Sequence, residues 1–201
     1  MFCEVPIKST CRKKLLKFAL QSTDWELGKK ESGGSYTFMA TRVPYEIFKD
    51  DVFLNFYLYN ILGIKNKKNL AGLIFKMKPK TFYVPHTDTN RTHTINLLLN
   101  DECESTTFFV KDEFRPSQVN VEFLEYDKDK YYVLNTQELH SVVNKNQDRY
   151  VFSFGNNKIS YDEVVKSVDK EYKLNKWQGI GNVIIGEKNI GWEIDNKWKN
   201  I

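Results

Sequence analysis

The chain has 201 residues, of which 41% are hydrophobic and 14% aromatic, and this suits one domain of moderate size. Its formal net charge of +4 is too small to indicate a nucleic-acid partner, and no run of about 18 apolar residues exists to span a membrane. Lys8 and the basic run 12–14 interrupt the stretch that a signal peptide would need to be apolar. We therefore expect a cytoplasmic protein with a single domain over residues 1–201.

The three cysteines do not suggest a disulfide framework. Cys3, Cys11 and Cys103 are odd in number, and no close pair has the spacing of zinc ligands. Cys103 lies between two glutamates, which disfavour a thiolate nucleophile. We expect three reduced thiols without a catalytic role.

The first third of the chain, residues 1–69, predicts helices with one strand. Residues 11–20 fit a short amphipathic helix, and residues 35–41 resemble a strand that follows a Gly-Gly turn. A longer helix is expected with Pro44 in its first turn and Gly63 as its stop. This segment would support the rest of the domain by covering a sheet.

From about residue 70 to residue 155 the sequence pattern indicates short strands in place of helices. Regularly spaced short strands with short connections predict a sandwich or barrel, and eight of them suit a jelly roll. The expected fold is therefore mainly β (α+β), a distorted jelly roll or double-stranded β-helix with the N-terminal helices packed on one sheet. The expected strands lie near 71–78, 80–88, 92–99, 105–110, 119–124, 130–135, 138–143 and 148–154.

Residues 156–201 form a C-terminal extension. Ser160 and Glu163 make a capping box, so a helix should begin there. Residues 182–195 are compatible with a hairpin in a stretch rich in Trp and Gly. Packing against an exposed sheet edge is the favoured interpretation of this tail, and a lid or a dimer contact is the alternative.

His86, Asp88 and His140 carry the most information about function. His86 and Asp88 are two residues apart on one predicted strand, so their side chains point the same way. His140 lies on a separate predicted strand. Two imidazoles and one carboxylate form the ligand set of non-haem Fe(II) oxygenases. A lone His-x-Asp also arises by chance, as a core histidine or a strand-end turn, and the third histidine, His93, is interpreted as structural or at the surface.

A basic residue follows this motif on the next predicted strand. Strand alternation places Arg149, Val151 and Ser153 on one face. A buried arginine needs an anionic partner, and a bound dicarboxylate would supply one with bidentate geometry.

The pattern of His86-x-Asp88, His140 and then Arg149 nine residues later resembles the 2-oxoglutarate and Fe(II)-dependent dioxygenases. The stretch from Tyr83 to Asn100 is most similar to the prolyl-hydroxylase-like branch of that superfamily. The resemblance covers about residues 70–155. It implies a jelly roll that uses dioxygen and 2-oxoglutarate to hydroxylate a C–H bond, with release of succinate and CO2.

The resemblance also implies roles for individual residues. His86, Asp88 and His140 would bind Fe(II). The far carboxylate of 2-oxoglutarate would pair with Arg149, assisted by the hydroxyl group of Ser153.

Further residues would assist the cosubstrate and the substrate. Leu98 stands where many relatives have a cosubstrate-binding tyrosine, so Tyr83 or Thr94 is the expected replacement. Arg91 would contact the substrate.

Two other functions are compatible with the sequence. One is a cupin-like metal enzyme that does not use 2-oxoglutarate, and the other is a jelly-roll binding module without catalysis. For the oxygenase, the substrate is expected to be a protein or peptide side chain or a small molecule. It would enter between the turn at 89–93, the N-terminal segment and the tail.

Overall fold

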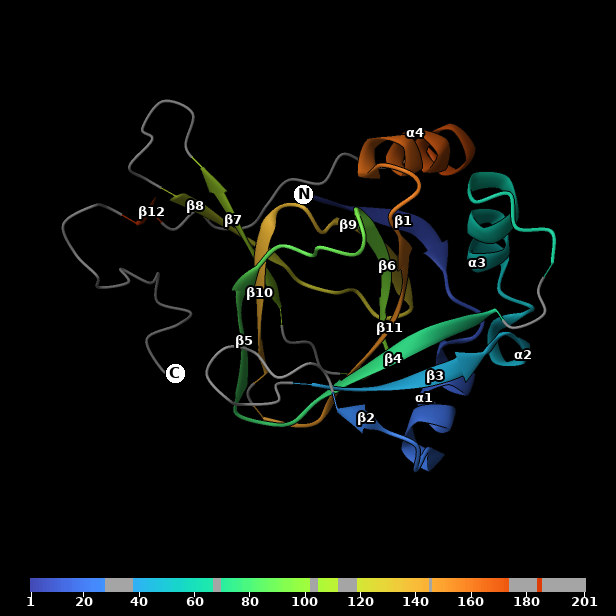
Figure 1. Ribbon diagram of the computed structural model, residues 1–201, viewed down its shortest axis with the longest axis horizontal. Helices are drawn as coiled ribbons and strands as arrows, with labels where there is room; N and C mark the ends of the chain where they lie inside the picture. The colour runs from blue at the N-terminus through green and yellow to red at the C-terminus, as the bar shows by residue number, and fades with distance from the viewer. Residues whose placement is uncertain are drawn as a thin grey trace.

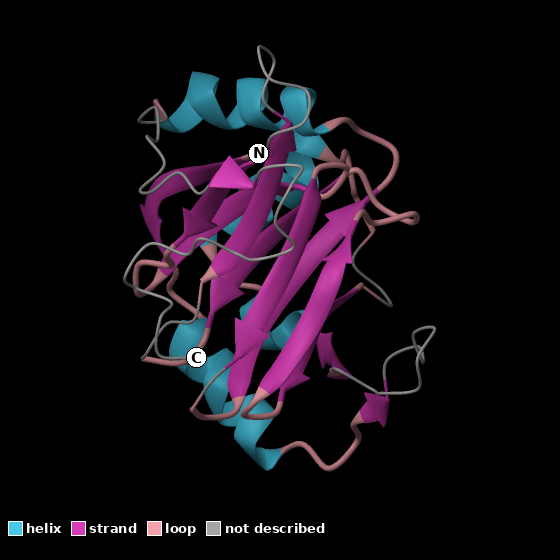
Figure 2. Cartoon of the chain, turned by 90° about the vertical axis from the view of Figure 1, so that its left-hand side faces the viewer, coloured by secondary structure: helices cyan, strands magenta, loops and turns pink. Residues whose placement is uncertain are grey.

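Two antiparallel β-sheets face each other in the computed structural model (Figure 1). The larger sheet has the strand order β1-β9-β6-β11-β4-β3-β2, and the smaller has the order β12-β8-β7-β10-β5. Figure 2 shows the smaller sheet in front, with helices above and behind it. The structure describes residues 1–27, 38–66, 70–101, 105–111, 119–144, 146–173 and 184–185.

Eight consecutive strands, β4 to β11, make a jelly roll. Within the larger sheet they lie in the order β9-β6-β11-β4, and within the smaller sheet in the order β8-β7-β10-β5. The chain therefore crosses repeatedly between the two layers, as a double-stranded β-helix requires. All eight predicted strands and the predicted fold class are confirmed. The strands are Ala71–Met77, Thr81–His86, His93–Leu98, Thr106–Lys111, Val119–Leu124, Lys130–Asn135, Leu139–Asn144 and Arg149–Asn156.

In the described residues, four further strands extend the two sheets beyond the jelly roll. β3 (Met39–Pro44) pairs with β4, and β2 (Glu26–Leu27) pairs with β3. β12 (Ile184–Ile185) pairs with β8 in the smaller sheet. β1 (Phe2–Lys8) pairs with β9, although no strand was expected there. Pro6 interrupts its pattern, and the pairing register shifts beside this proline, which has no N–H to donate.

The helices cover the larger sheet, as predicted. α1 (Arg12–Gln21) contacts β3 and β11, and α4 (Tyr161–Tyr172) contacts β1 and β9. The capping box of α4 is present, with Ser160 and Glu163 each accepting from the other's backbone N–H. No helix in the described ranges is long and apolar enough to cross a membrane.

The single helix expected from Pro44 to Gly63 is wrong, because three short helices replace it. α2 spans Tyr45–Phe48, α3 spans Val52–Phe56, and η1 spans Tyr57–Ile61 with π-helical bonding. Pro44 ends strand β3 instead of entering the first helical turn. Gly63 does adopt the left-handed conformation expected of a helix stop, with φ of 63°.

The break between α2 and α3 is caused by a tertiary contact at Asp51. Its buried carboxylate caps α3 by accepting from the backbone N–H of Leu54 at 3.1 Å. The same carboxylate accepts from the backbone N–H of Thr10 at 2.9 Å and from the hydroxyl of Ser9 at 3.1 Å. Because these donors come from a distant segment, local sequence does not reveal the break.

Several expectations fall partly or wholly on residues outside the described ranges. These are the Gly-Gly turn, the start of the strand at 35–41, Cys103 and most of the hairpin at 182–195. The other two cysteines, Cys3 and Cys11, are buried free thiols. Burial raises the pKa of each to about 12, so neither is a reactive thiolate at neutral pH.

Two apolar clusters leave room for a site between the sheets. The larger cluster joins the helices to the larger sheet and includes Leu15, Phe53 and Phe152. The smaller cluster lies between the two sheets and includes Leu98 and Phe108. A cavity lined by residues of both sheets lies next to this cluster.

Candidate metal centre and its cavity

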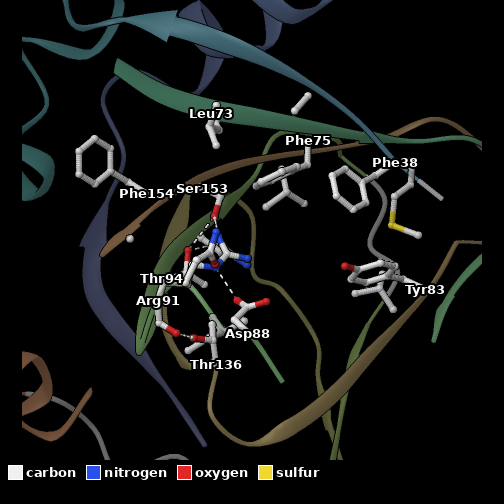
Figure 3. A pocket seen from close by; sticks show the side chains of 18 of the residues that line it. Phe38, Leu73, Phe75, Tyr83, Asp88, Arg91, Thr94, Thr136, Ser153 and Phe154 are labelled. Atoms are coloured by element: carbon white, nitrogen blue, oxygen red, sulfur yellow. Dashed lines mark hydrogen bonds and ion pairs between the residues drawn. The ribbon is translucent and has the colours of Figure 1, made fainter. Parts of the chain in front are cut away.

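A cavity of about 900 Å³ opens between the two sheets. His86, Asp88, His140 and Arg149 all line this cavity, so the predicted metal ligands and the predicted cosubstrate-binding arginine share one site. In Figure 3, Asp88, Arg91, Thr94 and Ser153 gather on one side of this chamber.

His86, Asp88 and His140 come together at one end of the cavity. His86 is the last residue of β5 and is paired directly with His140 near the start of β10. Each residue offers one ligand atom, and these three atoms lie within 4.8 Å of one another. The imidazole Nε2 of His86 is 3.5 Å from the carboxylate Oδ1 of Asp88.

Both histidines are held with the same ring nitrogen facing the cluster. Nδ1 of His86 lies 2.9 Å from the backbone oxygen of Val84, and Nδ1 of His140 lies 2.8 Å from that of Glu138. A carbonyl oxygen only accepts, so each Nδ1 carries the proton and each Nε2 keeps its lone pair. Burial lowers the pKa of His140, which favours the neutral imidazole that metals bind.

Asp88 is oriented by Arg91. The Arg91 Nε donates to Oδ2 of Asp88, which leaves Oδ1 facing His86. Burial alone would raise the pKa of Asp88, but the positive charge of Arg91 and the hydrogen bond that Arg91 donates to the carboxylate oppose burial, and the pKa is lowered to about 2. The carboxylate is therefore ionised, as a ligand must be.

The turn that carries Asp88 is tied to the connection between β9 and β10. The backbone N–H of Asp88 donates to the backbone oxygen of Thr136 at 2.8 Å. The hydroxyl of Thr136 and the side-chain amide of Gln137 each donate to the backbone oxygen of Arg91 at 2.8 Å. These contacts fix the turn that carries Asp88 against the connection that leads into β10, the strand that carries His140.

His93 is structural, as predicted. Its ring is fully buried and stands apart from the triad. Nε2 lies 2.6 Å from the phenol oxygen of Tyr57, and Nδ1 lies 3.1 Å from the backbone oxygen of Ile159. Both ring nitrogens are therefore engaged within the protein.

Arg149 lies in the same cavity without a counter-ion among the described residues. Its side chain is buried, and its Nη2 donates to the hydroxyl of Thr106 at 3.4 Å. Nη1 lies 4.0 Å from the sulfur of Met77, and the guanidinium lies 5.4 Å from the ring centre of Tyr126. Nε has no hydrogen-bond partner. A buried unpaired guanidinium is costly, so this group points to an anionic ligand.

The other predicted cosubstrate residues are distributed along the cavity. Arg149, Val151 and Ser153 all line it, which confirms that they share a face. Ser153, however, bonds to Thr94 at 2.7 Å and to Arg91 at 3.2 Å. Leu98 is buried in the apolar cluster between the sheets.

Tyr83 belongs to an aromatic wall that the sequence analysis did not predict. Its ring is 4.1 Å from that of His86 and 5.4 Å from that of Phe38, centre to centre. Phe38 also contacts Phe75 edge to face at 5.3 Å, and the guanidinium of Arg91 lies 5.8 Å from the Phe75 ring. In Figure 3 this wall lies opposite the polar side of the cavity. Three separate segments supply the rings, so no local signal could have revealed the wall.

The donor set fits a first-row divalent metal. Two neutral imidazoles and one carboxylate leave further coordination positions open toward the cavity. Each ligand also has an outer partner, a backbone carbonyl for each histidine and Arg91 for Asp88, as metal ligands commonly do.

Comparison of the fold with solved structures finds proteins of several kinds, all at low sequence identity. A prolyl-4-hydroxylase from Pseudomonas putida is 13% identical, with a TM-score of 0.49 over 74% of this chain and 86% of that one. A 2OG-Fe(II) oxygenase family oxidoreductase from Burkholderia pseudomallei is 14% identical, with a TM-score of 0.46 over 72% and 82%. The 7S globulin of Momordica charantia is 14% identical, with a TM-score of 0.39 over 66% and 33%.

No family model matches the sequence, and no curated protein matches it. With TM-scores below 0.5, the structural similarities do not assign an activity. The fold assignment therefore rests on the strand order, and any function has to rest on the residues of the cavity.

Proposed function

We propose that the protein is an Fe(II)- and 2-oxoglutarate-dependent oxygenase. The observation that carries this proposal is the shared cavity: an ionised carboxylate and two oriented imidazoles at one end, and a buried guanidinium without a counter-ion in the same chamber. A metal and an acidic cosubstrate together would satisfy both groups.

His86, Asp88 and His140 would hold the metal. The carbonyl oxygens behind the two imidazoles fix their tautomers, and Arg91 fixes the direction of the Asp88 carboxylate. When bound, iron with 2-oxoglutarate and dioxygen would supply the oxidation of a C–H bond, in which one oxygen atom goes to the substrate and the other to succinate, with release of CO2. The protein contributes position, charge and exclusion of water.

Arg149 would bind the far carboxylate of 2-oxoglutarate. The guanidinium is permanently charged and has an unused Nε–H, so a carboxylate at this place would gain a charge-assisted hydrogen bond. This contact distinguishes the proposal from a cupin-like metal enzyme, which would have no use for a dicarboxylate.

The substrate would be a protein or peptide side chain, as in the prolyl-hydroxylase-like proteins that the sequence resembles. The lining of the cavity includes the turn at 89–91 and residues of the N-terminal segment such as Glu26 and Phe38. The aromatic wall beside His86 would shield the reacting carbon from water and contact an apolar side chain.

The test is 2-oxoglutarate turnover by the full chain. Purified protein with Fe(II), ascorbate and 2-oxoglutarate should release succinate, and peptide and metabolite pools should identify the substrate that raises the rate. Replacing His140 with Ala should abolish turnover, whereas replacing His93 with Gln, outside the triad, should retain it in whatever fraction of the protein folds. Metal binding without any succinate formation would favour the cupin-like enzyme. Failure to bind Fe(II) or Mn(II) would favour a binding module.

A further inference from the structure

The smaller sheet turns one face toward the cavity and the other away from it. Successive side chains of a strand point to opposite faces, so a residue next to one that lines the cavity lies on the outer face. On β10, His140 lines the cavity, and its neighbour Leu139 lies on the outer face. On β5, Tyr83 lines the cavity, and its neighbours Phe82 and Val84 lie on the outer face. This outer face is turned toward the viewer in Figure 2.

Large apolar side chains are exposed on this outer face. Phe82 is 46% exposed, Val84 44% and Leu139 40%. Val143 is paired directly with Phe82 and lies beside it, partly buried. The described helices lie on the side of the larger sheet, so none of them shields these four residues, the outer patch (Figure 1). An exposed group of apolar side chains on neighbouring strands marks an interaction surface.

The outer face is shielded at one edge and open at the other. Directly paired residues share a face, and Leu139 of β10 is paired with Phe109 of β7, which is paired with Val121 of β8. Val121 is only 2% exposed, although it belongs to the same row as the exposed Leu139. The open half of the face is therefore the half formed by β10 and β5.

The C-terminal segment is attached to the shielded edge of this sheet. β12 pairs with β8, with Ile184 opposite Asn120 and Ile185 opposite Val119. Residues 186–201 therefore start at the β8 edge. From β8 to β5 there are three strand spacings, about 14 Å, a width that about five residues of extended chain can cross. The segment is long enough to reach the outer patch.

The sequence of this segment matches an apolar sheet face. Ile190, Trp192 and Ile194 alternate with Gly191 and Glu193. In an extended chain, residues two apart point the same way, so the three large apolar side chains can face the sheet together. Glu193 would then point toward water.

We propose that residues 186–201 fold back over the outer face of the smaller sheet, with the apolar side chains of residues 190–194 on the outer patch. Besides covering the patch, the segment shields β5, an edge strand whose one partner among the described strands is β10. An uncovered apolar edge strand is a place where two chains associate. The proposal uses no metal and no cosubstrate, so it does not depend on the proposed function.

A second molecule of the protein is the competing occupant of the outer patch. The C-terminal segment has the advantage of being tethered to the same sheet through β12. A short flexible tether gives an effective concentration of about 1 mM, which a second molecule in a dilute solution does not reach.

Photo-cross-linking of the full chain tests the proposal. Benzoylphenylalanine in place of Phe82 keeps an aromatic side chain in the outer patch and, on irradiation, forms a bond to a C–H group that it touches. After digestion with trypsin, position 82 should be joined to the peptide of residues 189–197 from the same molecule. The same amino acid in place of Leu20, which is exposed on helix α1, should give no such product.

Two variants of the segment identify the side chains that bind. Trp192→Asp should lower the yield of the cross-link from position 82 about tenfold, because an ionised carboxylate is costly to bury against apolar side chains. Glu193→Asp, on the other side of the alternation, should leave the yield unchanged. Both positions lie outside the jelly-roll strands, so the two variants share the wild-type core.

Three results would overturn the proposal. Cross-links between two molecules, with a yield that rises with protein concentration, would identify a second copy as the occupant. Cross-links from position 82 that never reach residues 186–201 would exclude the segment. An equal yield in the wild type and in Trp192→Asp would show that the apolar side chains do not hold the segment on the sheet.

Discussion

Arg12 and Arg149 are buried to nearly the same extent, at 3% and 6% exposure, but only one of them is satisfied within the protein. Arg12 pairs with Asp101 at 2.7 Å and Asp129 at 3.5 Å, and it donates to the backbone oxygen of Leu98. Arg149 has a hydroxyl and a thioether as neighbours and an Nε without a partner.

The difference teaches that burial alone does not mark a functional arginine. Arg12 joins helix α1 to the two loops that carry its carboxylates, and its contacts explain why it is there. Arg149 has no such explanation within the described residues. An unpaired buried charge destabilises the empty protein, so its persistence is understandable if a ligand supplies the missing charge.

The largest expected effect comes from replacing Arg149 with Met. The affinity of the Mn(II)-loaded protein for 2-oxoglutarate should fall at least about 100-fold, since loss of a buried charge pair costs about 3 kcal/mol or more. The free energy of unfolding of the metal-free protein should stay the same or rise, because an unpaired buried charge is removed. Calorimetry and urea unfolding measure the two quantities. A clear loss of stability would identify Arg149 as structural, like Arg12.

The histidines differ in the same way as the arginines. Both ring nitrogens of His93 have hydrogen-bond partners, whereas each triad histidine uses only Nδ1 in a hydrogen bond to a backbone oxygen. Burial lowers the pKa of His93 to about 4, below the usual value of about 6.5 for the unfolded chain. Between these two values the unfolded state binds an extra proton, so the free energy of unfolding should fall as the pH drops from about 6.5 to 4, by about 3 kcal/mol.

His93→Gln is the matched variant for that measurement. The amide does not titrate, so this component of the pH dependence should disappear from its urea unfolding curves while the wild type retains it. Identical pH profiles for the two proteins would show that His93 is not held neutral by its surroundings.

The smallest expected effect comes from replacing Arg12 with Met, the counterpart of the Arg149 variant. Unfolding free energy should fall by about 2 kcal/mol, since Asp101 is exposed and can be hydrated once the arginine is gone. The 2-oxoglutarate affinity of the folded protein should be unchanged. A parallel loss of affinity would show that the two arginines are not separate in function.

The sequence predicts the jelly roll well because its strands are short and regularly spaced with short connections, a pattern that is visible locally. The triad was predictable from spacing, although the strand expected at 80–88 ends at His86, so that Asp88 lies in the turn just beyond it and His140 falls on another strand. Arg149 was placed correctly on the cavity face by the alternation of β11.

What the sequence does not reveal depends on contacts between distant segments. Asp51 breaks the expected helix because Ser9 and Thr10 donate to its carboxylate. The position of Tyr126 beside Thr106 likewise depends on how β7 and the connection after β8 meet. Neither contact has a signal in the spacing of residues.

The central claim is tested most directly by adding Mn(II) and then 2-oxoglutarate to the metal-free chain in a calorimeter. The structure predicts a single Mn(II) per chain, loss of that binding in Asp88→Ala, and 2-oxoglutarate binding only after the metal is present. Binding of 2-oxoglutarate that is the same with and without metal, or metal binding that survives replacement of Asp88, would contradict it.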